Sequence, residues 1–409
     1  MNTISLKRGK KDLRICLAHS GAALASGGSR VALMQALLLQ EKGNSVLYTA
    51  PYIDEKLSSK YRNLNLRSWC PYFTFPILSR TFNRLIHTFY CDMNIFNGID
   101  VIITHNQPSP YVAYKANKHY NIPYIAYLHA PVKYVYPRKA EVDLWRKYGL
   151  INYFLNVFPS PAWWRKVDLL SVSNAGAILT NSEKIANRLK TVYGREAIVC
   201  HPGTDKGWLD GGIKTVDFVK KKYGLGSHVI LVTNRHVEYK KLHLVPTVLK
   251  KVKREYPDAQ VVITGRFNPT YTPRIINEAV KQGVRKDTIL TNIVSDEELA
   301  GLYNACQAYL YTAIDEDWGL GIIEAMYCSK PAICWKDAGA AYYINDGING
   351  FALNCYDLDQ MAETTSKLFG DKTLQQKIGD QARATASQFS WKRHLQILVD
   401  TINNLVLDS

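Results

Sequence analysis

Short runs of β-branched and aromatic residues alternate with longer amphipathic segments, and this series occurs twice along the chain. Strand candidates begin in the first half at Leu13, Ser45, Val101, Tyr124, Ala177 and Ala197, and in the second half at Val229, Gln260, Thr288, Ala308, Pro331 and Gly350. Strands that alternate with helices form parallel sheets. A chain of 409 residues is longer than one hydrophobic core ordinarily serves. We therefore predict an α/β protein with two sheets.

The segment HPGTDKGWLDGG, residues 201–212, separates the two series. Its proline and glycines favour a linker that can bend, so we interpret it as a hinge. The last segment has apolar residues spaced by three and four, at Trp391, Leu395, Leu398, Ile402 and Leu405. This spacing marks one face of a helix. The sequence therefore predicts domains over residues 1–205 and 206–380, followed by a C-terminal helical segment over 381–409.

The formal net charge of +16 calls for an anionic partner. Nucleic acid, anionic lipid and sugar phosphates all qualify. The basic residues are spread along the chain, and no zinc-finger spacing, helix-turn-helix signature or aromatic RNP-type strand is present. We therefore expect no nucleic acid as partner, although a basic nucleic-acid-binding protein stays open as an alternative of another class.

Neither a long uncharged apolar stretch nor a small-residue cleavage site follows the basic start of the chain. The eight cysteines are scattered and form no CxxC pair, so a disulfide framework is not expected. Reduced thiols fit a reducing compartment. From these features we predict a cytoplasmic protein that is neither exported nor membrane-spanning.

Two glutamates eight positions apart, Glu316 and Glu324, lie in the segment DEDWGLGIIEAM. If a strand ends near Ile314 and a helix starts near Gly319, both carboxylates can face one ligand beyond the strand's carboxyl end. Gly319 and Gly321 would let helix N-terminal N–H groups approach a diphosphate. Two alternatives are a pair of solvated carboxylates and a DxD metal site made by residues 315–317.

Arg235 directly follows an apolar strand, and Lys240 comes five residues later in the segment NRHVEYKKLHL. A transferase that uses no metal must neutralise a leaving diphosphate with fixed cations, and the arginine fork suits phosphate oxygens. Together with the glycine turn and the two carboxylates, this basic pair favours a leaving-group site over a metal site.

These motifs resemble those of the GT-B retaining glycosyltransferases of family 4. The E-x7-E motif of that family is matched by EDWGLGIIE and its R-x4-K motif by RHVEYK. SGGSR resembles the glycine loop after the first strand, YLHAPVKYVYP the H-x-P segment, and ILTNSEKIANRL followed by HPGTD the stretch that leads into the hinge. The resemblance implies two Rossmann-like domains that face each other across a cleft, with the C-terminal helix crossing back to the acceptor-binding N-terminal domain.

The resemblance also implies roles for individual residues. Glu316 would bind hydroxyls of the donor sugar, Glu324 the ribose hydroxyls, and Arg235 with Lys240 the diphosphate, while His129 would lie near the sugar. We predict His129, Glu316, Arg235 and Lys240 as catalytic. The predicted donor-binding residues are Gly27, Gly28, Arg235, Lys240, Asn292, Ile293, Glu316, Trp318, Gly319, Leu320 and Glu324. His105, which also ends a strand, is an alternative to His129.

The implied reaction retains the anomeric configuration and needs neither a cofactor nor a metal. The donor suggested by the motifs is GDP-mannose. One alternative is a UDP-sugar-dependent glycosyltransferase of the same fold, and another is a nucleotide-sugar epimerase. Asn292 replaces a glycine of the family near the base pocket. We expect a glycan or lipid-linked acceptor. The segment Trp69–Phe82 fits either a lipid-facing surface, with peripheral contact to an anionic membrane, or ordinary buried packing.

Overall fold

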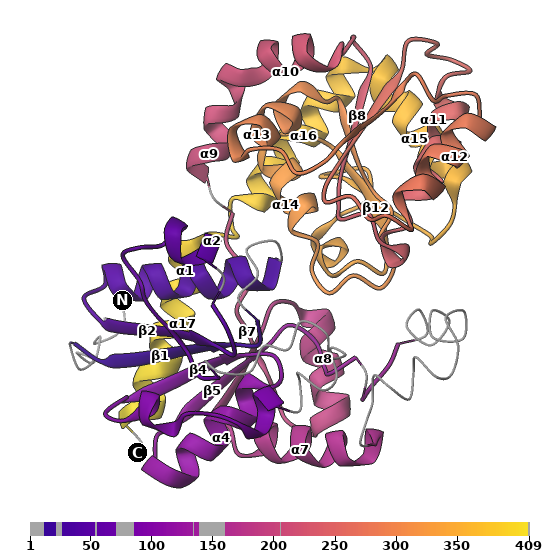
Figure 1. Ribbon diagram of the computed structural model, residues 1–409. Helices are drawn as coiled ribbons and strands as arrows, with labels where there is room; N and C mark the ends of the chain where they lie inside the picture. The colour runs from indigo at the N-terminus through magenta and orange to yellow at the C-terminus, as the bar shows by residue number, and fades with distance from the viewer. Residues whose placement is uncertain are drawn as a thin grey trace, which may run out of the picture. The chain divides into compact units, whose positions relative to one another are not determined.

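The computed structural model describes residues 12–21, 27–53, 55–70, 86–133, 135–138, 160–204 and 206–407. The chain divides into two units, shown in Figure 1. The first comprises Met1–His201 and Lys392–Ser409, and the second comprises Pro202–Trp391. The basic start of the chain and most of the aromatic segment 69–82 lie outside the described residues. No helix within the described ranges is both long and apolar enough to cross a bilayer.

The first unit contains a parallel sheet in the order β3-β2-β1-β4-β5-β6-β7. Its strands are β1 (Arg14–His19), β2 (Ser45–Ala50), β3 (Asn65–Ser68), β4 (Val101–His105), β5 (Tyr124–Leu128), β6 (Ala177–Thr180) and β7 (Ile198–Val199). The central strands β4 and β5 are buried along their whole length, as expected for parallel strands covered on both faces.

Helices cover both faces of this sheet (Figure 1). The described helices of the unit include α1 (Gly27–Glu41), α2 (Glu55–Lys60), η1 (Met93–Phe96), α4 (Ser109–Tyr120), α7 (Pro161–Ser173), α8 (Glu183–Tyr193) and α17 (Trp391–Leu407). Cys16 and Ile102 pack with residues of α4, α7 and α8. The alternate side chains of β4 and β5, such as His105 and Tyr127, contact α1 and α17.

The second unit contains a parallel sheet in the order β10-β9-β8-β11-β12-β13. Its strands are β8 (Val229–Thr233), β9 (Gln260–Thr264), β10 (Thr288–Thr291), β11 (Ala308–Tyr311), β12 (Ala332–Trp335) and β13 (Phe351–Leu353). The chain runs from β8 outward through β9 to β10, then returns to β11 on the other side of β8. The boundary between β8 and β11 is therefore the topological switch point of this sheet, where ligands of open α/β sheets bind.

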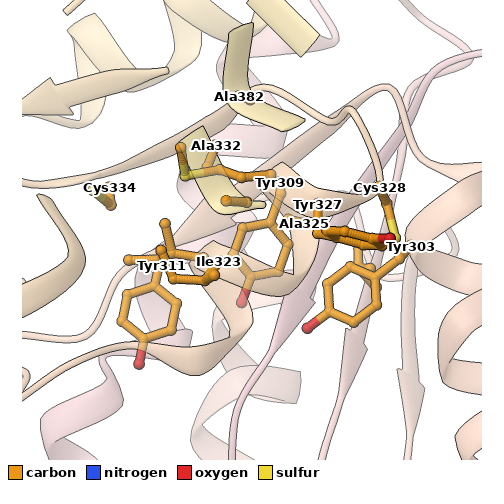
Figure 2. Packing of buried hydrophobic residues seen from close by; sticks show 14 of the residues in the cluster. Tyr303, Tyr309, Tyr311, Ile323, Ala325, Tyr327, Cys328, Ala332, Cys334 and Ala382 are labelled. Carbon is orange, nitrogen blue, oxygen red and sulfur yellow. The ribbon is translucent and has the colours of Figure 1, made fainter. Parts of the chain in front are cut away.

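Two apolar clusters fill the two faces of the second sheet. One joins alternate strand residues to α13, α14 and α16, and the other joins the remaining strand residues to α11 and α15. Figure 2 shows part of the first cluster, in which the hydroxyls of Tyr303, Tyr309 and Tyr311 point toward the same side. The helices of this unit are α9 (Lys206–Gly211), η2 (Gly212–Thr215), α10 (Val216–Tyr223), η3 (Glu238–Lys240), η4 (Leu242–Leu244), α11 (Val245–Val252), α12 (Thr272–Lys281), α13 (Asp296–Ala305), α14 (Leu320–Tyr327), η5 (Gly339–Tyr343), α15 (Leu358–Gly370) and α16 (Lys372–Ala386).

The segment predicted to be a bendable hinge contains ordered helix. Lys206–Gly211 forms α9, whose Leu209 is buried in the second unit's core. Gly212 lies so close to Ala300 that a side chain would not fit. Gly212 thus permits close packing of this segment against α13. The chain passes between the units at residues 201/202 and again at 391/392, because α16, which contains residue 381, belongs to the second unit.

All eight cysteines lie within the described ranges, and none forms a disulfide. Burial raises the pKa of Cys200 to about 12 and that of Cys306 to about 11. Both thiols are therefore protonated near neutral pH and pack as small apolar groups.

Candidate functional site

In the second unit, the predicted cations and the first glutamate lie beyond the carboxyl ends of adjacent strands. Arg235 follows β8, Lys240 ends the short helix η3, and Glu316 follows β11. Because β8 and β11 are hydrogen-bonded neighbours with parallel direction, these side chains meet at the switch point of the sheet.

Lys240 is a buried cation, with 7% of its surface exposed. Its Nζ forms an ion pair with a Glu316 carboxylate oxygen and donates a hydrogen bond to the Tyr311 hydroxyl at 3.1 Å. Burial and the nearby Glu316 carboxylate hold the pKa of Tyr311 well above its ordinary value. A buried charge needs such partners to offset its desolvation, and this pairing fixes the position of the ammonium group.

Tyr239 links the two cations that the sequence predicts. The Arg235 guanidinium donates from Nη2 to the Tyr239 hydroxyl at 2.8 Å. Lys240 Nζ lies 5.3 Å from the centre of the Tyr239 ring, within the range of a cation–π contact. The structure therefore brings Arg235 and Lys240 together, with Arg235 exposed and Lys240 buried.

Glu324, on α14, is also buried, which excludes the interpretation of this residue as a solvated helix side chain. Its carboxylate accepts a hydrogen bond from the Tyr303 hydroxyl at 2.8 Å. That hydroxyl lies 3.0 Å from Thr233 Oγ1, which lies 2.7 Å from the Tyr309 hydroxyl. Burial and Glu324 keep the pKa of Tyr303 well above its ordinary value, so Tyr303 stays a neutral donor.

Each of the two glycines at the start of α14, Gly319 and Gly321, is required by the local geometry. Gly319 has a φ of 99°, a left-handed conformation that other residues adopt only with strain. Gly321 lies against the hydroxyls of Tyr309 and Thr233, where an added Cβ would collide with both. The backbone at the start of α14 can therefore pass close to the tyrosine cluster only without side chains.

We expect Gly321→Ala to lower the free energy of unfolding by about 2 kcal/mol, because the methyl group overpacks a buried hydroxyl cluster. Urea denaturation measures this change. Gly211→Ala is the matched control, since a Cβ at Gly211 meets nothing within 4 Å and its φ is −60°. Equal stability of the two variants would contradict the close packing described at Gly321.

The other predicted donor-binding residues differ in their surroundings. Trp318 is 3% exposed, and its ring packs edge-on against Tyr343 and Phe389, so its side chain belongs to the core. Leu320 begins α14 and packs against the same core cluster. Asn292 follows β10 and accepts a hydrogen bond from Phe267 N at 3.2 Å, and Ile293 is 62% exposed.

In the first unit, the glycine loop and His129 come together. Gly27 and Gly28 begin α1, and His129 follows β5. A Cβ on Gly28 would lie 3.3 Å from His129 Nε2, so the glycine lets the helix start approach the ring. Burial lowers the pKa of His129 to about 3, which leaves the imidazole neutral at pH 7.

His105 and His129, which the sequence presents as alternatives, are hydrogen-bonded to each other. His105 Nδ1 lies 3.1 Å from His129 Nε2. Burial first, and then the neighbouring histidines, lower the pKa of His105 well below its ordinary value. The two imidazoles therefore form a hydrogen-bonded pair of neutral rings. His105 is buried and His129 is partly exposed.

Sequence reasoning missed the partners of the predicted residues. In the second unit these are the hydroxyls of Tyr239, Tyr303, Tyr309 and Tyr311. The alternation of tyrosines in AYLYT could have indicated that Tyr309 and Tyr311 share one face of a strand. Within the described ranges no group of three or more His, Cys, Asp or Glu side chains is arranged to hold a metal ion.

Comparisons with known proteins agree with this architecture. The family model described as Glycosyltransferase Family 4 matches residues 25–207, and the model described as Glycosyl transferases group 1 matches residues 214–385. The crystal structure of Anabaena Alr3699/HepE in complex with UDP and glucose resembles the chain with a TM-score of 0.75 at 17% identity, over 96% of this chain and 100% of that one. At this identity the likeness shows the fold.

Two curated relatives are similar over part of their length. The serotype-specific mannosyltransferase WbdA of Escherichia coli is 24% identical over 213 residues, which are 51% of this chain and 25% of WbdA. The D-inositol 3-phosphate glycosyltransferase of Mycolicibacterium smegmatis is 23% identical over 251 residues, 58% of this chain and 55% of that protein. The chain thus spans about a quarter to a half of these relatives. Since the two family models match residues 25–207 and 214–385, which include most of both parallel-sheet units, the chain belongs to the GT-B glycosyltransferases of group 1.

Proposed function

We propose that this protein transfers a hexose from a nucleotide diphosphate sugar to a glycan or lipid-linked acceptor. The observation that supports it best is the buried Lys240, held by Glu316 and Tyr311 beside Arg235 at the switch point of the second sheet. Two fixed cations next to a helix start match the charge of a diphosphate. The Glu316 carboxylate, which already accepts from Lys240, can accept from sugar hydroxyls as well.

The proposed reaction retains the anomeric configuration and needs no metal. The bond between the anomeric carbon and the diphosphate oxygen breaks, and a bond from that carbon to the acceptor oxygen forms on the same face. The acceptor's proton passes to the leaving phosphate oxygen, so the protein supplies no nucleophile, unlike a two-carboxylate retaining hydrolase. Arg235 and Lys240 would stabilise the charge that grows on the diphosphate. The Glu316 carboxylate is already paired with the Lys240 ammonium group, and this pairing supports a reaction that needs no metal ion.

For the donor we propose GDP-mannose first and a UDP-sugar second. WbdA, similar to half of this chain, is a mannosyltransferase by its name. The structural neighbour HepE was crystallised with UDP and glucose, which favours the second choice. For the cellular location we propose the cytoplasm. The net charge of +16 supports a peripheral contact with an anionic membrane.

Nucleotide binding tests the diphosphate site. GDP-, UDP- and ADP-sugars are added in thermal-shift measurements to the wild type and to Lys240→Ala. We expect one base class to stabilise the wild type, by about 2.7 kcal/mol at a hundredfold excess over Kd, and Lys240→Ala to lose most of that stabilisation.

Lys241→Ala is the matched control for this measurement. Lys241 is the adjacent lysine, but its Nζ pairs with Glu238 at 3.4 Å instead of Glu316, so the variant should respond to nucleotides like the wild type. Equal responses of Lys240→Ala and the wild type would refute the diphosphate site. A product whose anomeric configuration is opposite to that of the donor, measured by NMR coupling constants, would refute retention.

A further inference from the structure

A continuous chain of hydrogen bonds runs through the first unit from His129 to the backbone of His201. His129 Nε2 lies 3.1 Å from His105 Nδ1, and His105 Nε2 lies 2.8 Å from Gln35 Oε1 on α1. Gln35 Nε2 lies 2.9 Å from His394 Nε2 on α17. His394 Nδ1 lies 2.7 Å from the carbonyl oxygen of His201. Residues far apart in sequence are thus joined in one line.

The direction of every bond in this line follows from its last member. A backbone carbonyl can only accept, so His394 Nδ1 must carry a proton. A neutral imidazole carries a single proton, so His394 Nε2 is an acceptor and the Gln35 amide N–H donates to it. The Gln35 amide oxygen then accepts from the protonated Nε2 of His105.

The bond between His105 and His129 has a fixed direction as well. Because His105 carries its proton on Nε2, its Nδ1 is an acceptor, and the only group that can donate to it along the line is His129 Nε2–H. All three rings are neutral at pH 7, since burial lowers the pKa of His105 well below its ordinary value, that of His129 to about 3 and that of His394 to about 4. The amide orientation of Gln35, which is often ambiguous, is set here by its two histidine neighbours.

Cys200 does not disturb this order. Its Sγ lies 3.4 Å from His394 Nδ1 and 3.5 Å from the His394 carbonyl oxygen. Burial raises the pKa of Cys200 to about 12, so the thiol keeps its proton and directs it to the carbonyl. The sulfur can then only accept, weakly, from the Nδ1–H of His394.

We propose that Gln35 and His394 are positioning residues that lock His129 in the tautomer with the proton on Nε2 and a lone pair on Nδ1. Within the described residues no hydrogen bond occupies that Nδ1. His129 therefore offers a substrate a hydrogen-bond acceptor, which suits a hydroxyl group of a sugar and disfavours an unprotonated phosphate oxygen. This assignment of the ligand's chemistry rests on the proposed function, whereas the tautomer itself does not.

The tautomers can be measured without any activity. Wild-type protein labelled with ¹⁵N only in histidine gives long-range ¹H–¹⁵N spectra that distinguish the two ring nitrogens, and His→Asn variants assign the signals. At pH 7 we expect Nε2–H for His129 and His105 and Nδ1–H for His394. A wild-type His129 found as Nδ1–H, or as a rapidly averaging mixture, overturns the proposal.

Variants of Gln35 and His394 test whether this chain of hydrogen bonds sets the tautomer of His129. Gln35→Met keeps the size of the side chain but removes both hydrogen bonds, and His394→Phe removes the last ring nitrogens, three hydrogen bonds from His129. In each we expect His129 to become a tautomer mixture and kcat/KM to fall about ten- to a hundredfold, as for groups that orient a reacting side chain.

Gln40→Met is the control, because Gln40 lies on the same helix but is exposed, and among the described residues its side chain bonds only to the Asn63 carbonyl. It should keep the wild-type His129 spectrum and the wild-type kcat/KM. A pure Nε2–H signal retained in Gln35→Met, or a tautomer mixture with unchanged kcat/KM, overturns the positioning role. Absence of transfer in the wild type would instead contradict the proposed function, and the spectra would still decide the tautomer.

Discussion

Replacing Arg235 by glutamine is expected to lower kcat/KM for transfer about a hundredfold, which corresponds to about 3 kcal/mol of transition-state stabilisation. The guanidinium is exposed, and its bond to the Tyr239 hydroxyl is a surface contact. Loss of such a group changes the free energy of unfolding by about 0.5 kcal/mol or less. The variant thus separates catalysis from stability, which a Lys240 variant cannot do because it removes the ion-pair partner of the partly buried Glu316 carboxylate.

Steady-state kinetics and urea denaturation of the same preparation measure both quantities. Arg254→Gln is the matched control, because Arg254 is also exposed but follows α11, away from the carboxyl ends of the strands. It should leave kcat/KM and stability unchanged. If Arg235→Gln retained more than half of the wild-type kcat/KM, Arg235 would not contact the leaving diphosphate.

Acidification from pH 7 to pH 5 is expected to destabilise the first unit by several kcal/mol. Burial lowers the pKa of His19 and of His394 to about 4 in the folded protein, whereas an unfolded histidine titrates near 6.5. The unfolded chain therefore binds more protons between these values. The stability that these residues contribute is fully present above pH 6.5 and is lost as the pH falls toward 4.

At pH 5 each of these two histidines has lost about 2 kcal/mol of that contribution, since one pKa unit corresponds to about 1.4 kcal/mol. His105 and His129, whose pKa values burial also lowers, act in the same direction. Asp168 opposes them. Burial raises its pKa to about 6, so on acidification the folded protein binds this proton before the unfolded chain does. At pH 5 this adds about 1 kcal/mol to the free energy of unfolding.

Hydrogen exchange in peptides from β1, β4 and β5 measures this loss within the first unit. The second unit also contains histidines with lowered pKa, His236 and His243, so its peptides alone do not test the prediction. His394→Phe removes one titrating group. The decline in protection of the first unit between pH 7 and pH 5 should be about 2 kcal/mol smaller in this variant, and equal declines would contradict the assignment of His394 as a buried neutral ring.

The sequence was sufficient to predict the twofold α/β series because parallel strands covered on both faces are continuous apolar runs. Strands such as β4 and β8 show this pattern, and the structure confirms two parallel sheets with flanking helices. β3 was missed. Its residues, NLRS, form an edge strand that is only partly buried, so it lacks the apolar run by which a strand is recognised.

The candidate site was predictable only to the level of strand ends. Spacing placed Arg235, Lys240 and Glu316 after strands, but their contact depends on β11 lying beside β8, and strand order is not written in any local pattern. The hydrogen bond between Gln35 and His394 joins residues 359 positions apart. This hydrogen bond forms only when α17 packs on α1. A local sequence motif therefore could not predict it.

The discontinuity of the first unit has a consequence for biosynthesis. Residues 202–391, which form the whole second unit, leave the ribosome before the segment that forms α17. The second unit can therefore fold while the nascent first unit still exposes the surface of α1 and β5 that later receives His394. Translation order thus delays completion of the unit whose synthesis begins first.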